Sequence, residues 1–256
     1  MTDFDDRWLD VDFEQCPEFV FGDLGACTFG QPAYEQRFGT LDASEIEAAI
    51  DATEEAGGGL DQLVTRIYDQ GQEGSCVANA TCQAAEIIQA KERGKDAVVH
   101  LSAISLYKRI GRTAQSGAIV SDGWKELKAR GVLPLDNEAN RAAFAHWMPN
   151  TGFSRPFPAG WEETAKHFAG LEAWPISTVE GLYTALLTGH PVVVGRQGHA
   201  ICYTRLMRDN RRRKIMKYAN SWHENWGEKG FGYDSESQIR EAARWAFAVR
   251  AMRGRQ

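Results

Sequence analysis

The stretch from Asp69 to Ala80 constrains this chain more than any other, because a polar, glycine-rich loop ends there at a cysteine that opens an apolar helix. Apolar residues after Cys76 recur at helical spacing: Val77, Ala78, Ala80, Ala84, Ala85, Ile87 and Ile88. In the first turn of a buried helix, unpaired backbone N–H groups and the positive end of the helix dipole favour an anion. We therefore expect the Cys76 thiol to ionise readily, since such positions can lower a cysteine pKa from ~8.5 to ~3.5–7.5 when an imidazolium lies nearby.

Further along the chain there are residues that could serve this thiol as a base and as a group that orients the base. Among the histidines and asparagines of the chain, His199, 123 residues after Cys76, and Asn220, 144 residues after it, are the ones that a resemblance to a known family implies for these roles. A cysteine nucleophile needs both kinds of partner within hydrogen-bond reach. Taken singly, each residue also has a plainer structural interpretation, as a small buried Cys, a strand His and a turn Asn.

Three separated motifs resemble the active-site segments of papain-like cysteine peptidases, over roughly residues 60–250. They are Gln70 followed by Gly74-Ser75-Cys76 at the start of a helix, His199 between two small residues, and Asn220-Ser221-Trp222 with Trp226-Gly227 and Gly230-Phe231 behind it. In that family the partner His and Asn lie roughly 130–150 residues after the Cys. Three motifs in this order arise by chance far less easily than one, so the catalytic interpretation is favoured.

The resemblance implies a catalytic triad of Cys76, His199 and Asn220. His199 would accept the thiol proton, Asn220 would hold the imidazole through its side-chain oxygen, and Trp222 would shield that hydrogen bond from water. The oxyanion hole would consist of the Gln70 side-chain amide and the Cys76 backbone N–H. The implied chemistry is cleavage of peptide or related amide bonds in a peptide or protein substrate through a thioester, without a metal or a cofactor.

The same resemblance implies an α+β, papain-like fold with two lobes, a helical lobe carrying the Cys76 helix and an antiparallel β lobe. Sequence patterns predict helices over residues 76–91, 102–109, 124–130, 137–147, 161–168 and 179–187, then strands over 191–195, 199–207, 214–220, 230–233 and 245–252. Two features depart from the family. Only residues 195–198 separate the apolar run 192–194 of the first strand from His199, and Gly117, the expected contact to the substrate backbone, has no neighbouring glycine.

The N-terminal part of the chain is acidic. Residues 1–60 hold fifteen Asp and Glu against two Arg, a balance of −13, whereas the rest carries 27 Lys and Arg against 20 Asp and Glu, or +7. Opposite charges favour docking of this part onto the rest, and a solvated acidic arm is the alternative. A helix capped by Asp42 ends at Gly57–Gly59. We therefore divide the chain into residues 1–59, an acidic prosegment or docking arm for a protein partner, and residues 60–256, the catalytic domain.

The composition, 43% hydrophobic and 25% charged over 256 residues, is that of an ordinary globular protein. No stretch approaches the ~18 apolar residues of a membrane span, and the acidic start lacks a secretory signal, so we expect a cytoplasmic protein without membrane association. The five cysteines include no C-x-x-C pair, which argues against a disulfide framework and a zinc site. Glu73 stands where secreted papain-like enzymes carry a disulfide-bonded Cys, in agreement with a reducing compartment.

The basic run from Arg205 to Lys214 is interpreted as a solvated hairpin tip and not as a nucleic-acid surface, because Asp209-Asn210 lies within it. His223, where the family has Gly, is expected as an exposed loop residue, and Cys82 as a core residue.

Two rival functions stay open. One is a catalytically silent papain-like fold that serves as a binding or assembly component, and the other is a triad that acts on isopeptide or peptidoglycan cross-links.

Overall fold

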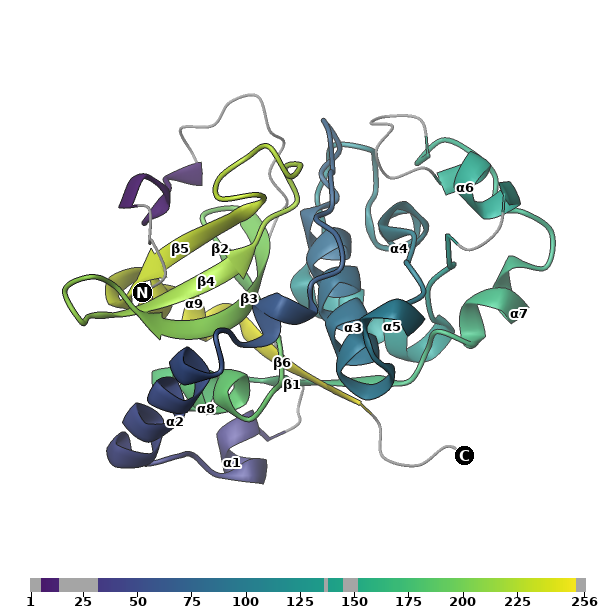
Figure 1. Cartoon of the computed structure of the whole chain (residues 1–256). Helices are drawn as coiled ribbons and strands as arrows, with labels where there is room; N and C mark the ends of the chain where they lie inside the picture. The colour runs from purple at the N-terminus through teal and green to yellow at the C-terminus, as the bar shows by residue number, and fades with distance from the viewer. Residues whose placement is uncertain (1–5, 14–31, 136–137, 145–151, 252–256) are drawn as a thin grey trace.

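The computed structural model of the chain describes residues 6–13, 32–135, 138–144 and 152–251. Within these residues the chain forms two lobes, one built mainly from helices and the other around an antiparallel sheet (Figure 1). Most helices precede most strands along the chain. The α+β class expected from the order of the apolar patterns is confirmed. No helix in this described part is long and apolar enough to cross a membrane.

The helical lobe is organised around α3 (Cys76–Arg93), which is buried along most of its length. A helix that buries side chains all round belongs in the middle of a core. The lobe also contains α4 (Ala103–Ile110), α5 (Val120–Arg130), α6 (Glu138–Phe144) and α7 (Trp161–Lys166). The packing of α5 on α3 depends on Gly123, because a side-chain carbon there would lie 2.8 Å from the Thr81 hydroxyl oxygen.

The second lobe is built on a six-stranded sheet in the order β1-β6-β2-β3-β4-β5, with every neighbouring pair antiparallel. Its strands are β1 (Leu171–Pro175), β2 (Val192–Arg196), β3 (His199–Arg208), β4 (Lys214–Ala219), β5 (Phe231–Ser235) and β6 (Ala246–Ala251). β2 and nearly all of β3 are buried, in agreement with the continuous apolar run that predicted a buried strand. Helices α8 (Val179–Leu187) and α9 (Glu236–Ala242) pack against this sheet.

Among the elements that differ from the sequence-based expectations are α5, β1 and β2. α5 begins at Val120 and not at residue 124, because its turn-like start is held in a helix by close packing on α3. β1 is a strand that local sequence does not predict, since it ends in a proline and depends on pairing with β6 at the sheet edge. β2 continues to Arg196, so only two residues separate it from β3. Of the helix expected over residues 137–147, both ends lie outside the described residues.

Helix α2 (Ala43–Glu55) docks against β3 and α8, below the sheet in Figure 1. Asp42 caps it as expected. The Asp42 side chain accepts the N–H of Glu45 at 2.8 Å, and the Glu45 carboxylate accepts the N–H of Asp42 at 2.8 Å. Ile46 and Ile50 are buried, so the helix is held by an apolar face as well as by its charges.

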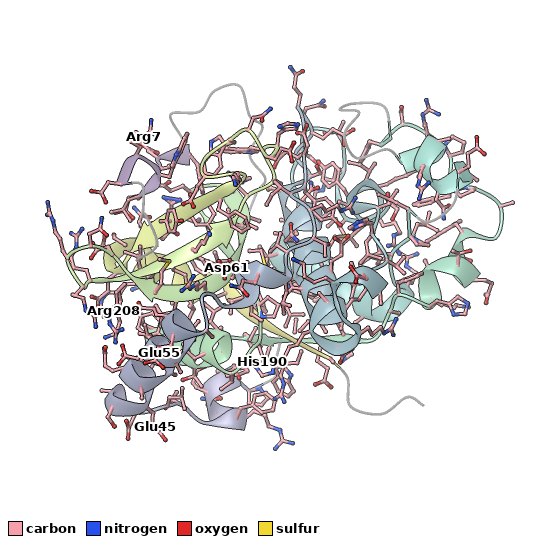
Figure 2. All side chains as sticks on the ribbon, viewed as in Figure 1. Arg7, Glu45, Glu55, Asp61, His190 and Arg208 are labelled. Atoms are coloured by element: carbon pink, nitrogen blue, oxygen red, sulfur yellow. The ribbon has the colours of Figure 1, made fainter. Side chains whose placement is uncertain are left out.

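The carboxylates of α2 face basic residues of β3 and β4, with Arg208 at the centre (Figure 2). Arg208 pairs with Asp51 at 2.6 Å, with Glu54 at 3.5 Å, and closely with Glu47, which Lys214 also approaches at 2.5 Å. Hydrogen bonds from Lys214 and Arg208 lower the pKa of Glu47 to about 2. The charge asymmetry predicted such docking, and for the segment that forms α2 the prediction is confirmed.

The interpretation of the basic run as a solvated tip is therefore wrong for its first part. The side chains of Arg205 and Arg208 are only 4% and 6% exposed, whereas that of Arg212 is 69% exposed. The physical reason is that α2 and the turn after it cover the strands here. Arg208 contacts Glu54 of α2, 154 residues away, and Arg205 lies 3.9 Å from Asp61, contacts that the run itself does not reveal. The division of the chain at residue 59 and a protein partner for the acidic segment stay predictions.

Replacing Arg208 with Met is expected to lower the free energy of unfolding by about 1–2 kcal/mol, because three partly exposed carboxylates lose their common cation. The matched change Arg212→Met removes an exposed guanidinium 3.8–3.9 Å from two of the same carboxylates and should cost less than about 0.5 kcal/mol. Urea titration measures both, since guanidinium chloride would screen the ion pairs. Equal losses in the two variants would contradict the central role of Arg208.

Candidate active site

Cys76 is the first residue of α3, and backbone hydrogen bonds shape the loop that precedes it. Gly71 has φ 54°, in the left-handed region that favours glycine, and it turns the chain directly after Gln70. The Ser75 carbonyl accepts both the N–H of Asn79 at 3.0 Å and the side-chain amide of Asn79 at 2.8 Å. Cys76 thus lies at a helix N-terminus, where the dipole favours a thiolate.

The chain just ahead of this loop is anchored on α3 by the buried carboxylate of Glu86. That carboxylate accepts hydrogen bonds from the Arg66 guanidinium at 2.8 Å, the Tyr68 hydroxyl at 2.6 Å and the Leu101 N–H at 2.7 Å. Burial raises the pKa of Glu86, but the charge of Arg66 and the hydrogen bond to His100 outweigh it and lower the pKa. An ionised Glu86 therefore fixes the approach of the chain to the nucleophile loop.

His199 is the first residue of β3 and directly follows the two-residue turn Gln197-Gly198. Both turn residues have positive φ, 48° and 72°, as the two-residue hairpin turns that match strand twist require. Arg196, the last residue of β2, pairs with His199 across the turn. The position of His199 is therefore set by a tight hairpin and not by a long loop.

His199 and Asn220 form a buried hydrogen bond, with 2.8 Å between Nε2 and Oδ1. Because the same Oδ1 accepts the N–H of Ser221 at 2.8 Å, it is an acceptor, and His199 Nε2 carries the hydrogen. Trp222 stacks on the imidazole with ring centroids 4.6 Å apart and planes inclined by 29°. This leaves Nδ1 as the basic nitrogen of a neutral His199 ring.

Burial controls the protonation of His199, which is 0% exposed. Desolvation lowers the pKa of His199 to about 4, the hydrogen bond with Asn220 acts in the opposite direction, and the nearby charge of Arg196 lowers it further. At neutral pH the ring is therefore uncharged in this arrangement.

Gln70 joins the nucleophile loop to the segment that carries Asn220. The Gln70 N–H donates to the Ser221 carbonyl at 2.8 Å, and the Ser221 hydroxyl donates to Gln70 Oε1 at 2.6 Å. Gln70 Nε2 also donates to the Glu73 carbonyl at 2.9 Å. An amide nitrogen carries two hydrogens, so the expected oxyanion contact would use the second. Ser221 is a further site residue, and its place between Asn220 and Trp222 is the signal that could have found it.

The two lobes meet at this point. Asp69 and Trp222 form an antiparallel bridge, and a small cavity at the junction is lined by Tyr68, Asn79, Ala80, Gln83, Ala200, Ala219, Asn220 and Ser221. The first turns of α3, the start of β3 next to His199 and the end of β4 next to Asn220 therefore border the same junction. Cys76 and His199 are both 0% exposed, so both side chains are covered in this arrangement.

Gly117 lies beside the nucleophile loop, and its N–H is already engaged. It donates to the Tyr107 hydroxyl oxygen at 3.1 Å, and that hydroxyl donates to the Thr113 carbonyl at 2.8 Å. The Gly74 N–H donates to the Ala114 carbonyl at 2.8 Å, and a side-chain carbon on Gly74 would lie 2.6 Å from the Gly117 nitrogen. Tyr107 therefore competes for the N–H that Gly117 would offer to a substrate, and the substrate role of Gly117 stays a prediction.

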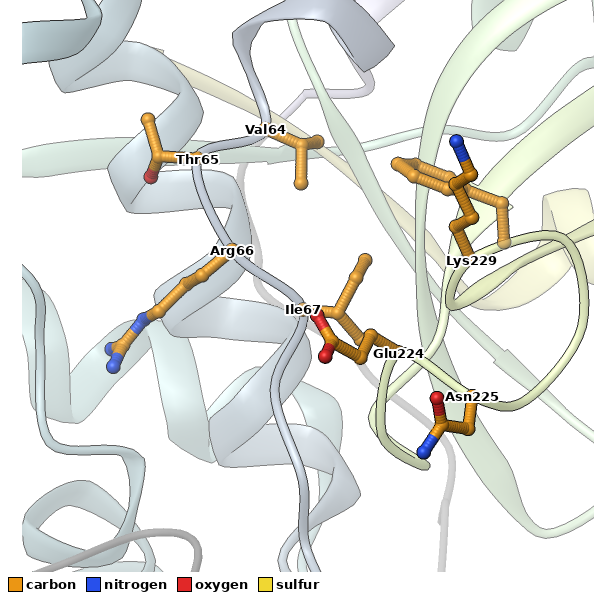
Figure 3. A pocket seen from close by; sticks show the side chains of 8 residues that line it. Val64, Thr65, Arg66, Ile67, Glu224, Asn225 and Lys229 are labelled. Carbon is orange, nitrogen blue, oxygen red and sulfur yellow. The ribbon is translucent and has the colours of Figure 1, made fainter.

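The loop after Trp222 borders an open pocket, opposite the residues that lead into the nucleophile loop (Figure 3). Val64, Thr65 and Ile67 line one side, and Glu224, Asn225 and Lys229 line the other. His223, in the same loop, is exposed as expected. Its φ of 70° lies in the left-handed region, which explains physically why a glycine would suit this position.

Two further cysteines of the described residues, Cys82 and Cys202, have thiols whose pKa differs from that of a reactive thiol. Cys82 and Cys202 are buried, and burial raises the pKa of both thiols well above the ordinary value. Cys82 is thus a core residue, as expected. Cys16 and Cys27 lie outside the described residues. Among the residues that the structure describes, no three His, Cys, Asp or Glu side chains are grouped to hold a metal ion.

No family model and no curated protein match this sequence. Solved structures of cysteine proteases do match the fold. Xylellain from Xylella fastidiosa is 21% identical with a TM-score of 0.58, covering 73% of this chain and 83% of that chain. Digestive procathepsin L 3 from Tenebrio molitor is 18% identical with a TM-score of 0.60, covering 76% and 69%. Bromelain from Ananas comosus, in complex with the E64 inhibitor, is 16% identical with a TM-score of 0.59, covering 76% and 98%. The chain has the papain-like two-lobed fold that the motifs predicted.

The His199 ring is expected to titrate near pH 4, because burial penalises its charged form. NMR of ring-labelled histidine measures this pKa, and His199→Gln assigns the signal. In the unfolded chain the ring titrates near ~6.5, so the unfolded state binds more protons between these two values. The free energy of unfolding should therefore fall as the pH drops through this window, and less steeply in His199→Gln. A His199 signal that titrates above pH 6 would contradict the buried, neutral ring.

Proposed function

We propose that this chain is a cysteine peptidase that cleaves peptide bonds in peptide or protein substrates, with Cys76 as the nucleophile. The observation that carries the proposal is the buried His199–Asn220 hydrogen bond under Trp222, at the lobe junction faced by the first turn of α3. A nucleophile, a base and a group that orients the base are the three parts that thiol catalysis requires. The papain-like fold supports the same assignment.

In the proposed reaction His199 Nδ1 accepts the proton of Cys76 Sγ, and the thiolate attacks the carbonyl carbon of the scissile bond. Asn220 keeps the ring in place by accepting the Nε2 hydrogen. The carbonyl oxygen becomes negative and receives hydrogen bonds from the Gln70 side chain and the Cys76 N–H, each such donor being worth ~2.7–4 kcal/mol. His199 then protonates the leaving amine, which leaves a thioester. Water, deprotonated by His199, hydrolyses the thioester and restores the thiol.

The low pKa of His199 is compatible with this proton transfer. A negative sulfur attracts the imidazolium and raises the pKa of His199 at the moment the proton moves. The N-terminus of α3 stabilises the sulfur anion at the same time. Both charges therefore appear together, and the exclusion of water strengthens their attraction.

An epoxide inhibitor of thiol peptidases is expected to label Cys76 at neutral pH, while Cys82 and Cys202 stay unlabelled because burial raises the pKa of their thiols. Peptide mapping by mass spectrometry locates the adducts. Cys76→Ala should abolish hydrolysis of a mixed peptide pool and keep the fold, whereas Cys82→Ala, a matched change six residues further along α3, should keep activity in proportion to its folded fraction.

Two outcomes of this experiment would overturn the proposal. A Cys76→Ala protein as active as the parent would remove Cys76 from the chemistry. A chain that shows neither a Cys76 adduct nor hydrolysis would instead be a catalytically silent member of the fold.

Asn220→Ala is expected to lower kcat on the order of 10–100-fold and leave measurable turnover, because the ring loses its orienting group but keeps its basic nitrogen. The control is Asn225→Ala, the same change at an exposed position in the same segment, and it should leave kcat unchanged. Steady-state kinetics on one peptide substrate compare the two. If both variants lost activity equally, the Asn220 side chain would have no special role.

A further inference from the structure

The N-terminal segment Leu9–Phe13, here called the N-terminal strap, is built into the sheet lobe. Leu9 pairs in parallel with Tyr233 of β5, and the Asp10 N–H donates to the Tyr233 carbonyl at 2.8 Å. The Asp10 carboxylate accepts the Ser235 N–H at 2.7 Å. The strap therefore covers the edge of the sheet at β5 through contacts within this chain.

The other end of the strap is bonded to the hairpin that presents His199. Arg196 donates from Nη2 to the Val11 carbonyl at 2.5 Å, and the Phe13 N–H donates to Gln197 Oε1 at 3.3 Å. Arg196 is the last residue of β2 and Gln197 is the first residue of the turn. The strap thus connects β5, at one edge of the sheet, to the turn that directly precedes His199.

Arg196 makes this connection costly to break. Its side chain is 0% exposed, its Nε donates to Gln238 Oε1 at 2.9 Å, and its Nη1 lies 3.5 Å from the Asp234 carboxylate. A buried guanidinium needs its hydrogen-bond acceptors, because an uncompensated buried charge is strongly destabilising. The Val11 carbonyl is one of the acceptors that keep Arg196 satisfied at the base of the hairpin.

Phe13 completes the surroundings of the catalytic ring. It is 0% exposed, and its ring meets His199 edge-to-face at 4.9 Å and Trp222 at 5.2 Å between centroids. The Arg196 guanidinium lies 4.3 Å from the Phe13 ring centroid. Such aromatic and cation–π contacts depend on geometry, so they favour one orientation of the imidazole.

We propose that the N-terminal strap is a permanent wall of the active site, with Phe13 and Arg196 as positioning residues that hold the His199 hairpin for the proposed peptidase reaction. The two-residue turn before His199 is too short to cover the His199 ring. The N-terminal strap covers it instead, through Phe13. The proposal rests on the proposed function. It also removes residues 9–13 from the part of the chain that could act as an inhibitory prosegment. Residues 9–13 are needed for activity, so they are not part of an inhibitory segment whose removal switches the enzyme on.

Phe13→Ala in the full chain tests this inference. We expect kcat to fall at least about 10-fold, since the imidazole is less well oriented. We also expect the pKa of His199 to rise from about 4 toward its ordinary value, since water reaches the ring. Peptide kinetics and NMR of ring-labelled histidine give the two readouts, and a merely structural role elsewhere would not move the second.

Two further variants make the test specific. Phe38→Ala is the matched control, because Phe38 belongs to α1 (Tyr34–Phe38), is 39% exposed and meets Trp174 edge-to-face, away from the site. It should change neither kcat nor the His199 titration. Phe13→Leu keeps an apolar side chain of similar size, so it should fold even if Phe13→Ala does not, and give an intermediate His199 pKa and intermediate kcat.

The outcomes separate this inference from the proposed function. Faster hydrolysis by the Phe13 variants would show an inhibitory plug and overturn the inference, and so would folded Phe13 variants with unchanged kcat and unchanged His199 titration. If the parent chain hydrolyses no peptide and Cys76 takes no epoxide, the proposed function fails. In that case a His199 pKa that rises in Phe13→Leu would still support the positioning contact, and an unshifted pKa would overturn it.

Discussion

The site depends first on the contact at which Gln70 and Ser221 join the two lobes. The proposed nucleophile begins a helix of one lobe and its proposed base begins a strand of the other, so their separation is set by how the lobes are held together. Backbone and side-chain hydrogen bonds of 2.8 and 2.6 Å link the two residues, and both are buried. Each bond adds only about 1 kcal/mol net, but leaving such groups unpaired in the interior costs about 1–3 kcal/mol. The junction is therefore held mainly by the penalty for opening it.

The features that the sequence predicts well are local ones. The helix after Cys76 and the cap at Asp42 each depend on residues within one or two turns of each other, and both are present in the structure. The pairing of His199 with Asn220 could be predicted for a different reason, because the family resemblance links motifs that are distant in sequence. Interactions between residues that are close in sequence, or between residues of known family motifs, can be predicted without coordinates.

What the sequence does not predict are contacts between distant segments that share no pattern. The aromatic residues of the N-terminal part follow no period, so nothing singles out Phe13 as the neighbour of His199. Arg208 looks like a surface charge until α2 is placed over it. Tyr107, which takes the N–H of Gly117, is 10 residues away in sequence but belongs to another element. In each case tertiary packing decides the role of the residue, and the local sequence is compatible with several roles.

The short hairpin before His199 fixes the orientation of this residue but leaves no loop that could change shape around it. Strand side chains alternate between the two faces of a sheet, so a slip of one residue would turn His199 away from Asn220 and toward the opposite face. The left-handed turn Gln197-Gly198 fixes the register of β2 against β3 and excludes that slip. A hairpin this tight cannot also fold over its own histidine, so the surroundings of the ring must come from elsewhere. The environment that keeps the imidazole of His199 neutral therefore includes residues far from it in sequence, and the protonation of His199 depends on the fold of both lobes and of the N-terminal strap.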